Sequence, residues 1–325
     1  MTKIQTGREF IQQKCPGFPV PTNSYLVLST ARSGSTMLTT YLGKIGFGYP
    51  IEAFNPNKNS RTRYNWGIDY SDPIAYIKKA IEFQSIDGVM GMKFMPNQFL
   101  IFLDNARRFL KPTNLVYKDA ELVEIFFPST KYIHLERKNK LKQAISYSKA
   151  LQDGIWREAE GEDEKYKKYV TSAVYDREHI ECCFDLSLAN DQYWRHYLLN
   201  NQLSFFHVYY EDLTNNYFEE IEKIHNYLGI VGKEICAPPL RKQATGLSEK
   251  WEKQFTKETP WLLDSHFVDL YEHGRQEDLF IERCRMVFNQ REQQRWKVMP
   301  ANRYKKIRSL KLRISRKLNS LLKKE

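Results

Sequence analysis

The residues best suited to chemistry form a loop of small and polar side chains, Ser29 to Thr36, that contains Arg32. An apolar run, Leu26 to Leu28, precedes the loop, and an amphipathic helix is predicted from Met37 onward. The backbone N–H groups of such a loop and the positive end of the new helix point at one spot, where a phosphate or sulfate group binds. The loop therefore predicts an anion site.

This loop differs from the phosphate-binding loop of nucleoside triphosphatases, which has the pattern G-x-x-x-x-G-K-[ST]. No glycine stands at the required distance before Gly34, no lysine precedes Ser35, and Arg32 supplies the positive charge instead. The combination favours a phosphosulfate over a nucleoside triphosphate as the ligand.

A second candidate anion site follows the predicted strand that contains His134. Arg137 stands at the end of that strand, and Ser146 follows on the next predicted helix. A guanidinium and a hydroxyl in this arrangement can hold one phosphate from two sides. Alone, an arginine at a strand end is more often a surface ion-pair partner. Together with the first loop, it predicts two anion sites on successive strand-to-helix turns, one for each end of a nucleotide.

The composition is that of a folded globular protein with one large or two small domains. Of 325 residues, 42% are hydrophobic, and they include 20 tyrosines, 19 phenylalanines and 6 tryptophans, which excludes a disordered chain. The five cysteines lack the spacing of a zinc site or a disulfide framework. The sequence shows neither a signal peptide nor a run long enough to cross a bilayer. We expect a reduced, cytoplasmic protein without metal and without a specific nucleic-acid partner.

The positive charge is concentrated at the end of the chain. Residues 303–325 hold ten basic residues and one acidic residue, a net charge of +9, which leaves +2 of the total +11 for everything before them. Apolar residues recur in this tail at helical spacing: Ile307, Leu310, Ile314, Leu318 and Leu321. A basic amphipathic helix suits an anionic surface, so peripheral contact with the inner face of a membrane is one expectation. The alternatives are a helix packed on the body and a tail that attracts nucleic acid without specificity.

The elements that must position these residues alternate along the chain. Short apolar runs predict strands at 25–29, 89–95, 132–135 and 205–210. Longer amphipathic segments predict helices, among them 73–83, 140–151, 186–200 and 217–228. This alternation predicts an α/β fold with a central parallel sheet flanked by helices. Ligands of such sheets bind beyond the carboxyl ends of the strands, where the loop after residue 29 would lie.

Several motifs occur in a recognisable order. They are STARSGST, GYPIEAF, GMKFMPNQ, HLERKNKLKQAISYSKALQDGIW, YYEDL and APPLRKQAT followed by EKW. Over about residues 24–256, this series resembles the bacterial trehalose 2-sulfotransferase family and, less closely, sulfotransferases in general. The resemblance implies a P-loop-like sulfotransferase fold: a domain over 1–300, with a helical extension at 257–300, and then the basic amphipathic tail at 301–325. It also hints at a homodimer.

The resemblance implies a nucleotide donor, 3′-phosphoadenosine 5′-phosphosulfate (PAPS), with adenosine 3′,5′-bisphosphate (PAP) as the product and no metal. The loop residues expected to hold the 5′-phosphosulfate are Arg32, Ser33, Gly34, Ser35 and Thr36. Arg137 and Ser146 match the family's contacts with the 3′-phosphate, and Lys242 is a third candidate for that contact.

Sulfuryl transfer needs a base for the acceptor hydroxyl and positive charge near the oxygens that gain charge. Many sulfotransferases use a histidine two residues after a strand lysine. Here the residue two positions after Lys93 is Met95, which accepts no proton. The resemblance instead assigns the base to Glu52. A carboxylate there can take the hydroxyl proton if burial near Phe54 raises its pKa, and we expect such a raised pKa. Lys93 and Arg32 are expected to neutralise the moving group.

The resemblance implies a carbohydrate, a glycolipid or a small hydroxylated metabolite as the acceptor. Aromatic faces suit sugar rings, and the residues expected to border the acceptor are Glu52, Phe54, Trp66, Tyr70, Tyr147 and Trp156. Ala53 stands in place of a bulky aromatic residue of the trehalose-type pattern, and a long segment follows the last motif. Trehalose itself is therefore not predicted as the acceptor.

Two further sets of polar residues are expected to have a structural role and not a catalytic one. His134 lies within a predicted strand and is expected to be a hydrogen-bonded core histidine. The adjacent carboxylates Glu211 and Asp212 are expected to close a strand and cap the helix that follows.

Two other function classes stay open at this point. A P-loop-type nucleotide-dependent kinase would share the strand-loop-helix unit, but it needs magnesium and a loop lysine. A non-catalytic protein that binds membranes or polyanions would depend on the tail at 303–325 alone.

Overall fold

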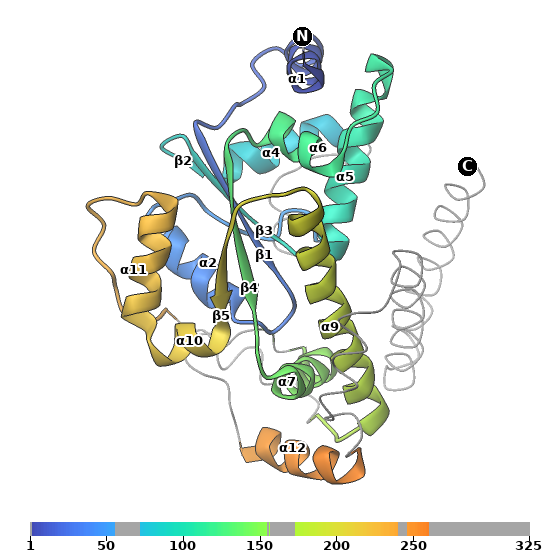
Figure 1. Cartoon of the computed structure of the whole chain (residues 1–325), viewed down its shortest axis with the longest axis vertical. Coiled ribbons are helices and arrows are strands. Elements are labelled where there is room, and N and C mark those ends of the chain that lie inside the picture. The colour runs from blue at the N-terminus through green and yellow to red at the C-terminus, as the bar shows by residue number, and fades with distance from the viewer. Residues whose placement is uncertain (1, 56–71, 155, 157–172, 240–245, 260–325) are drawn as a thin grey trace, which may run out of the picture.

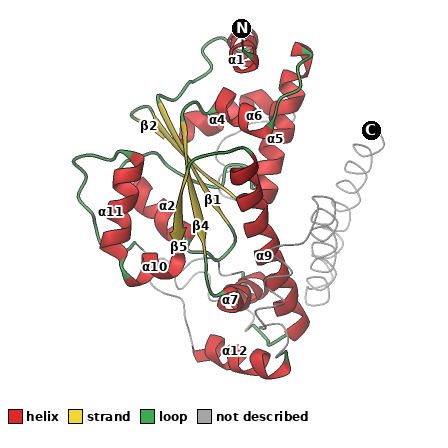
Figure 2. Cartoon of the chain, viewed as in Figure 1, coloured by secondary structure: helices red, strands yellow, loops and turns green. Residues whose placement is uncertain are grey.

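The computed structural model describes residues 2–55, 72–154, 156, 173–239 and 246–259. Figures 1 and 2 show a central sheet with helices on both sides. The strands are β1 (Asn23–Ser29), β2 (Ser85–Ile86), β3 (Val89–Phe94), β4 (Thr130–Glu136) and β5 (Phe205–Tyr209). The helices are α1 (Lys3–Lys14), α2 (Ser35–Lys44), α4 (Pro73–Gln84), α5 (Pro96–Leu110), the 3₁₀ turn η1 (Lys111–Thr113), α6 (Asp119–Phe126), α7 (Lys140–Asp153), α9 (Arg177–Asn200), α10 (Tyr210–Asn215), α11 (Tyr217–Leu228) and α12 (Gly246–Glu258).

The five strands form one sheet in the order β2-β3-β1-β4-β5. β1 pairs in parallel with β3 and with β4, and β4 pairs in parallel with β5. The predicted α/β class is confirmed, and each of the four predicted strands is present. The sequence interpretation missed β2, a two-residue antiparallel strand at the edge. Its signal was the dipeptide Asp87-Gly88, whose φ angles of 49° and 78° give a tight hairpin turn.

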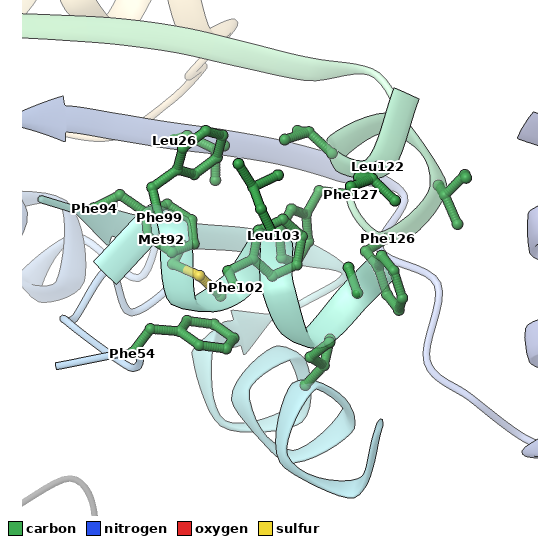
Figure 3. Packing of buried hydrophobic residues seen from close by; sticks show 14 of the residues in the cluster. Leu26, Phe54, Met92, Phe94, Phe99, Phe102, Leu103, Leu122, Phe126 and Phe127 are labelled. Atoms are coloured by element: carbon green, nitrogen blue, oxygen red, sulfur yellow. The ribbon is translucent and has the colours of Figure 1, made fainter. Parts of the chain in front are cut away.

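The central strand β1 is buried on both faces, because its side chains alternate between two cores. Leu26 and Leu28 belong to a cluster that includes Phe94 and residues of α4, α5, α6 and α9, part of which Figure 3 shows. Tyr25 and Val27 point the other way, into a cluster with residues of α2 and α11. Burial on both faces explains why the strand is an unbroken apolar run rather than an alternating one.

Helix α7, which carries Ser146, is held by a side-chain cap at its start and by packing against two other helices. Asn139 caps the start of α7, where its side chain accepts a hydrogen bond from the Lys142 amide. α7 packs against α9 and α12 through a separate apolar cluster that includes Trp251 and Phe255. α9 begins nine residues earlier than predicted, at Arg177, because the Asp176 side chain caps it.

The parallel arrangement brings the carboxyl ends of β1, β3, β4 and β5 to the same edge of the sheet. The residues that follow these strands therefore gather there, as the position of the predicted loop required. Among the helices of the described ranges, none is long and apolar enough to cross a membrane. Nearly all of the predicted extension at 257–300 and the whole tail at 301–325 lie outside the described residues.

Candidate active site

The predicted anion loop joins β1 to α2 and is tightly folded. Arg32 and Gly34 both adopt left-handed backbone angles, with φ of 64° and 88°. The Ser33 hydroxyl is turned inward and donates to the Thr30 carbonyl oxygen at 2.8 Å. Gly34 is the N-cap of α2 and has no side chain with which to cap the helix. The positive end of α2 is therefore available to an anion from outside.

Two buried side chains from elsewhere in the chain support this loop. The Gln143 amide of α7 donates to the Thr30 hydroxyl at 2.6 Å and to the Ala31 carbonyl at 2.8 Å. The Trp194 indole of α9 donates to the Ser29 carbonyl at 3.0 Å. The sequence interpretation assigned neither residue to the site, because their contacts span more than a hundred positions along the chain.

Glu52 and Lys93, which were predicted to act together, form an ion pair with Nζ 2.7 Å from Oε1. Lys93 also donates to the Thr36 hydroxyl at 3.3 Å, so the pair lies beside the first turn of α2. Gln98 and Asn55 donate to the other carboxylate oxygen, Oε2, at 2.8 Å and 3.0 Å. The Glu52 side chain keeps 27% of its surface exposed, whereas Lys93 keeps 6%. Glu52, the candidate base, is thus held in place by its partners but remains partly accessible to solvent.

The prediction of a raised Glu52 pKa was wrong. Burial alone would raise the pKa, but the Lys93 ammonium and the amide donors of Gln98 and Asn55 outweigh it, so the pKa lies below its usual value. Gln98 was missed as a site residue. Its signal was a polar side chain at a buried position in the first turn of a helix that opens with Pro96.

Arg32, Arg137 and Ser146 form a second group of contacts at the loop. The Arg32 Nε donates to the Ser146 hydroxyl at 2.9 Å, and its guanidinium also donates to the Trp156 carbonyl. Arg137 donates to the Arg32 carbonyl at 3.4 Å. The Arg32 side chain therefore contacts Ser146, one of the predicted 3′-phosphate residues.

The Arg137 guanidinium is a buried cation that is only partly compensated. Its side chain is 14% exposed, and its Nε has no hydrogen-bond partner in the part of the chain that the structure describes. Burial lowers the pKa of Arg137, although the nearby Tyr210 and Glu211 oppose the shift. A buried guanidinium donor without an acceptor is costly, so this site favours an anion.

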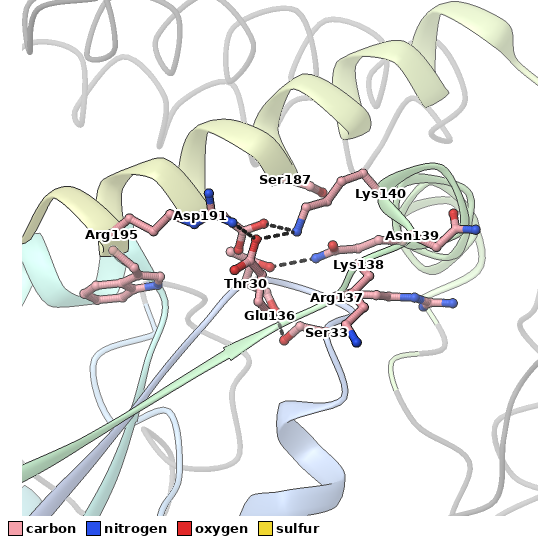
Figure 4. A network of polar contacts seen from close by, with 12 residues as sticks. Thr30, Ser33, Glu136, Arg137, Lys138, Asn139, Lys140, Ser187, Asp191 and Arg195 are labelled. Atoms are coloured by element: carbon pink, nitrogen blue, oxygen red, sulfur yellow. Dashed lines mark hydrogen bonds and ion pairs between the residues drawn. The ribbon is translucent and has the colours of Figure 1, made fainter. Parts of the chain in front are cut away.

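Next to Arg137 in the chain, the end of β4 is anchored by a buried ionic network, part of which Figure 4 shows. Glu136 Oε1 lies 3.1 Å from Lys140 Nζ and 2.8 Å from the Arg195 guanidinium, and Oε2 lies 3.0 Å from His207 Nε2. Lys140 also pairs with Asp191 at 2.5 Å. Although burial raises the pKa of Glu136, His207 and the two cations hold it well below its usual value. The network fixes the strand end from which Arg137 projects.

The prediction that His134 is a hydrogen-bonded core histidine was half wrong. It is fully buried, but neither ring nitrogen has a partner among the described residues. Its ring stacks on that of His207, with centroids 5.1 Å apart and planes 8° from parallel. Burial lowers the pKa of His134 to about 3.

The donor atoms of His134, Glu136 and His207 lie within 4.8 Å of one another, the one grouping in the described ranges with metal-ligand spacing. A metal ion lies close to the plane of each imidazole that binds it, and two parallel stacked rings cannot both meet that condition. Lys140 and Arg195 already occupy the carboxylate. The geometry therefore indicates a polar network and not a metal centre.

The prediction that Glu211 and Asp212 cap a helix was also wrong. Neither carboxylate caps α10, which begins with Tyr209 as an N-cap without a side-chain hydrogen bond. Asp212 instead pairs with the Lys138 ammonium at 2.8 Å. Glu211 accepts hydrogen bonds from the backbone amides of Lys138 and Asn139 at 2.9 Å and 3.0 Å. Both therefore bind the turn that follows Arg137.

The residues expected to border the acceptor differ in their exposure to solvent. Phe54 is 2% exposed and packs among Tyr76, Phe94 and Phe102, so it is a core residue. Tyr147 and Trp156 contact each other, with ring centroids 6.0 Å apart, and Trp156 is 48% exposed. The remaining expected contacts, Trp66, Tyr70 and Lys242, lie outside the described residues.

Comparison with known proteins points in one direction. The family model described as Stf0 sulphotransferase matches residues 24–258. The trehalose 2-sulfotransferase of Mycolicibacterium smegmatis is 25% identical over 259 residues, which cover 72% of this chain and 95% of that protein. The trehalose 2-sulfotransferase of Mycobacterium tuberculosis (strain Erdman) is 24% identical over 262 residues, which cover 73% and 96%.

Proposed function

The chain belongs to the Stf0 sulphotransferase family, and from this membership we propose that it transfers a sulfuryl group from PAPS to a hydroxyl of a carbohydrate, glycolipid or hydroxylated metabolite. The observation that carries the donor assignment is the buried Arg137 guanidinium. Its Nε lacks a hydrogen-bond acceptor within the described ranges and lies near a helix start that has no side-chain cap. Two anion-binding groups side by side suit a nucleotide with phosphates at two positions.

The residues that would hold the donor fall into two sets. The loop residues Ser33, Gly34, Ser35 and Thr36 would surround the phosphosulfate at the positive end of α2. Arg137 and Ser146 would hold the 3′-phosphate, with Lys242 as a further contact. Because the Arg32 side chain donates to Ser146, its charge would act with Arg137 on the 3′-phosphate.

Glu52 would act as the base. It is ionised at neutral pH, because its pKa lies below the usual value. As the acceptor oxygen bonds to sulfur, the bond from sulfur to the phosphate oxygen breaks and the hydroxyl proton passes to Glu52. Lys93 lies between Glu52 and Thr36 and would stabilise the charge that develops on the departing phosphate oxygen. Positioning and electrostatics would supply most of the rate enhancement.

A sugar is the acceptor class that the relatives favour, since both are trehalose 2-sulfotransferases. The exposed face of Trp156 and its neighbour Tyr147 are suited to stack on a sugar ring. Identity of 25% does not carry trehalose itself to this chain. A glycolipid would agree with the basic segment at 303–325, which would bring the enzyme to a membrane surface.

The test is a screen of sugars, glycolipids and hydroxylated metabolites with ³⁵S-labelled PAPS, performed on the wild type and on Glu52→Gln. The substitution keeps the shape of the side chain and removes the base, so we expect turnover to fall by about a hundredfold or more with unchanged PAP affinity. Glu82→Gln is the matched control, because Glu82 is an exposed carboxylate that pairs only weakly, with Lys79 at 3.3 Å. Near-normal turnover by Glu52→Gln would contradict the mechanism.

A binding measurement distinguishes the proposal from a kinase. PAP is expected to raise the melting temperature of the protein, whereas ATP with magnesium is not. Stabilisation by ATP and magnesium, without stabilisation by PAP, would contradict the donor assignment.

A further inference from the structure

We propose that Tyr210 and Glu211, at the beginning of α10, position Arg137 for the 3′-phosphate and thereby determine the preference for nucleotides that carry one. The inference deepens the proposed function and rests on PAPS being the donor. It concerns the motif YYEDL, to which the sequence interpretation gave only a capping role.

Tyr210 lies between the two anion-binding groups. A Cβ atom added to Gly34 would lie 2.4 Å from Cδ2 of Tyr210, so the ring packs directly on the anion loop. The Arg137 guanidinium lies over the Tyr210 ring, 4.6 Å from its centroid. An aromatic face orients a guanidinium without using its N–H donors. The ring therefore sets the separation of the loop and Arg137 while leaving the arginine able to bind an anion.

Glu211 fixes the turn that carries Arg137 into α7. Its two carboxylate oxygens accept hydrogen bonds from the consecutive amides of Lys138 and Asn139. Asn139 in turn caps α7, the helix that bears Ser146. One carboxylate thus links both residues proposed to hold the 3′-phosphate.

The distance from Glu211 to Arg137 is informative. Oε1 lies 3.9 Å from the Arg137 Nε, which is too far for a hydrogen bond but close enough for attraction. The carboxylate orients the guanidinium, and the Nε donor stays without an acceptor in the described part of the chain. An arriving phosphate oxygen would find this donor already aimed.

A role of Glu211 through its charge and a role through positioning lead to opposite predictions. A carboxylate beside a phosphate site repels the phosphate, so a role through charge alone predicts that its neutralisation tightens nucleotide binding. A positioning role predicts that the affinity for the 3′-phosphate falls when the carboxylate no longer reaches the two amides. Glu211→Asp keeps the charge and shortens the reach, and Glu211→Gln keeps the length and removes the charge.

The experiment measures dissociation constants of the full-length chain for PAP and for adenosine 5′-monophosphate (AMP), which lacks the 3′-phosphate. We expect both Glu211 variants to lower the preference for PAP over AMP by about tenfold, with AMP affinity within about twofold of wild type. Tyr210→Leu should reduce the same preference, and Tyr210→Phe should keep it because the ring remains. Asp212→Asn is the matched control, since Asp212 pairs with the Lys138 side chain, whereas Glu211 binds the backbone amides of the turn.

The outcomes separate this inference from the proposed function. A wild type that fails to prefer PAP over AMP overturns the donor assignment and the inference with it. A wild type that prefers PAP, with Glu211→Asp and Tyr210→Leu variants that are folded and retain the preference, overturns the inference alone. Tighter binding of both nucleotides by Glu211→Gln also overturns it, because the role would then be one of charge.

Discussion

Lys93 and Glu52 are joined by an ion pair of 2.7 Å, although they come from a buried strand and from a loop forty-one positions earlier. The same ammonium reaches Thr36, in the first turn of the helix that follows the anion loop. The candidate base is therefore connected to the predicted anion loop through one cation. This arrangement keeps Glu52 ionised, at the cost of lowering its basicity.

The pH profile of kcat/KM should report this arrangement. Because protonation removes the base, the rate falls as pH falls through the Glu52 pKa, and in the wild type this acid limb should lie below pH 4.5. Gln98→Leu removes a donor to the ionised form and leaves the burial, so the acid limb should move to higher pH. Asn55→Ala should move it in the same direction, since Asn55 donates to the same oxygen. Unchanged limbs in both variants would contradict the assignment of Glu52.

Gly34→Ala should weaken nucleotide binding. The new Cβ would collide with the Tyr210 ring at 2.4 Å, in a backbone conformation with φ of 88°. We expect PAP affinity to fall by at least about tenfold and the melting temperature to fall. Gly17→Ala is the control, because Gly17 has φ of 72° with nothing within 4 Å of its added Cβ. It should show only the conformational cost, about 1–2 kcal/mol, and bind PAP normally. Equal effects of both variants on PAP affinity would argue against the contact with Tyr210.

Glu136→Gln should destabilise the fold strongly. The substitution removes the charge of the carboxylate that Lys140, which is partly buried, and the Arg195 guanidinium share. Breaking a buried ionic network in this way costs about 3–5 kcal/mol in the free energy of unfolding, measurable by urea denaturation. The exposed pair of Asp104 with Arg108 provides the comparison: Asp104→Asn should cost about 1 kcal/mol or less. Similar losses of unfolding free energy in the two variants would contradict the prediction that the network at Glu136 contributes more than a surface ion pair.

His134 should make stability depend on pH. Its pKa is about 3 in the folded chain and about 6.5 in an unfolded one, so the unfolded state binds a proton first as pH falls. The wild type should therefore lose about 1.4 kcal/mol per pH unit below pH 6.5, relative to His134→Leu, until about pH 3. Urea denaturation of both proteins at pH 7.5 and pH 5 measures the difference. His196→Leu, at an exposed position, should behave as the wild type does. Parallel curves of unfolding free energy against pH for the wild type and His134→Leu would contradict the lowered pKa of His134.

Local sequence was sufficient for the fold class and for the four parallel strands. The apolar run of β1, the small residues after it and the amphipathic α2 have local physical causes, and the structure confirms each of them. The alternation of strands and helices also predicted that the strand ends would share one edge, because parallel strands connected by helices run in the same direction. This is why the loop after residue 29 could be placed at that edge from the sequence.

The partners of those residues were decided only by the tertiary structure. Whether a buried carboxylate has a raised or lowered pKa depends on which donors reach it, and Gln98 reaches Glu52 from forty-six positions away. In the same way Glu211 contacts a turn more than seventy positions earlier instead of its own helix. Residue type and spacing determine which groups lie at the edge of the sheet. Hydrogen bonds and ion pairs, however, depend on distances of a few ångströms between segments that are far apart in the sequence. Those distances are set only when the helices pack on the sheet.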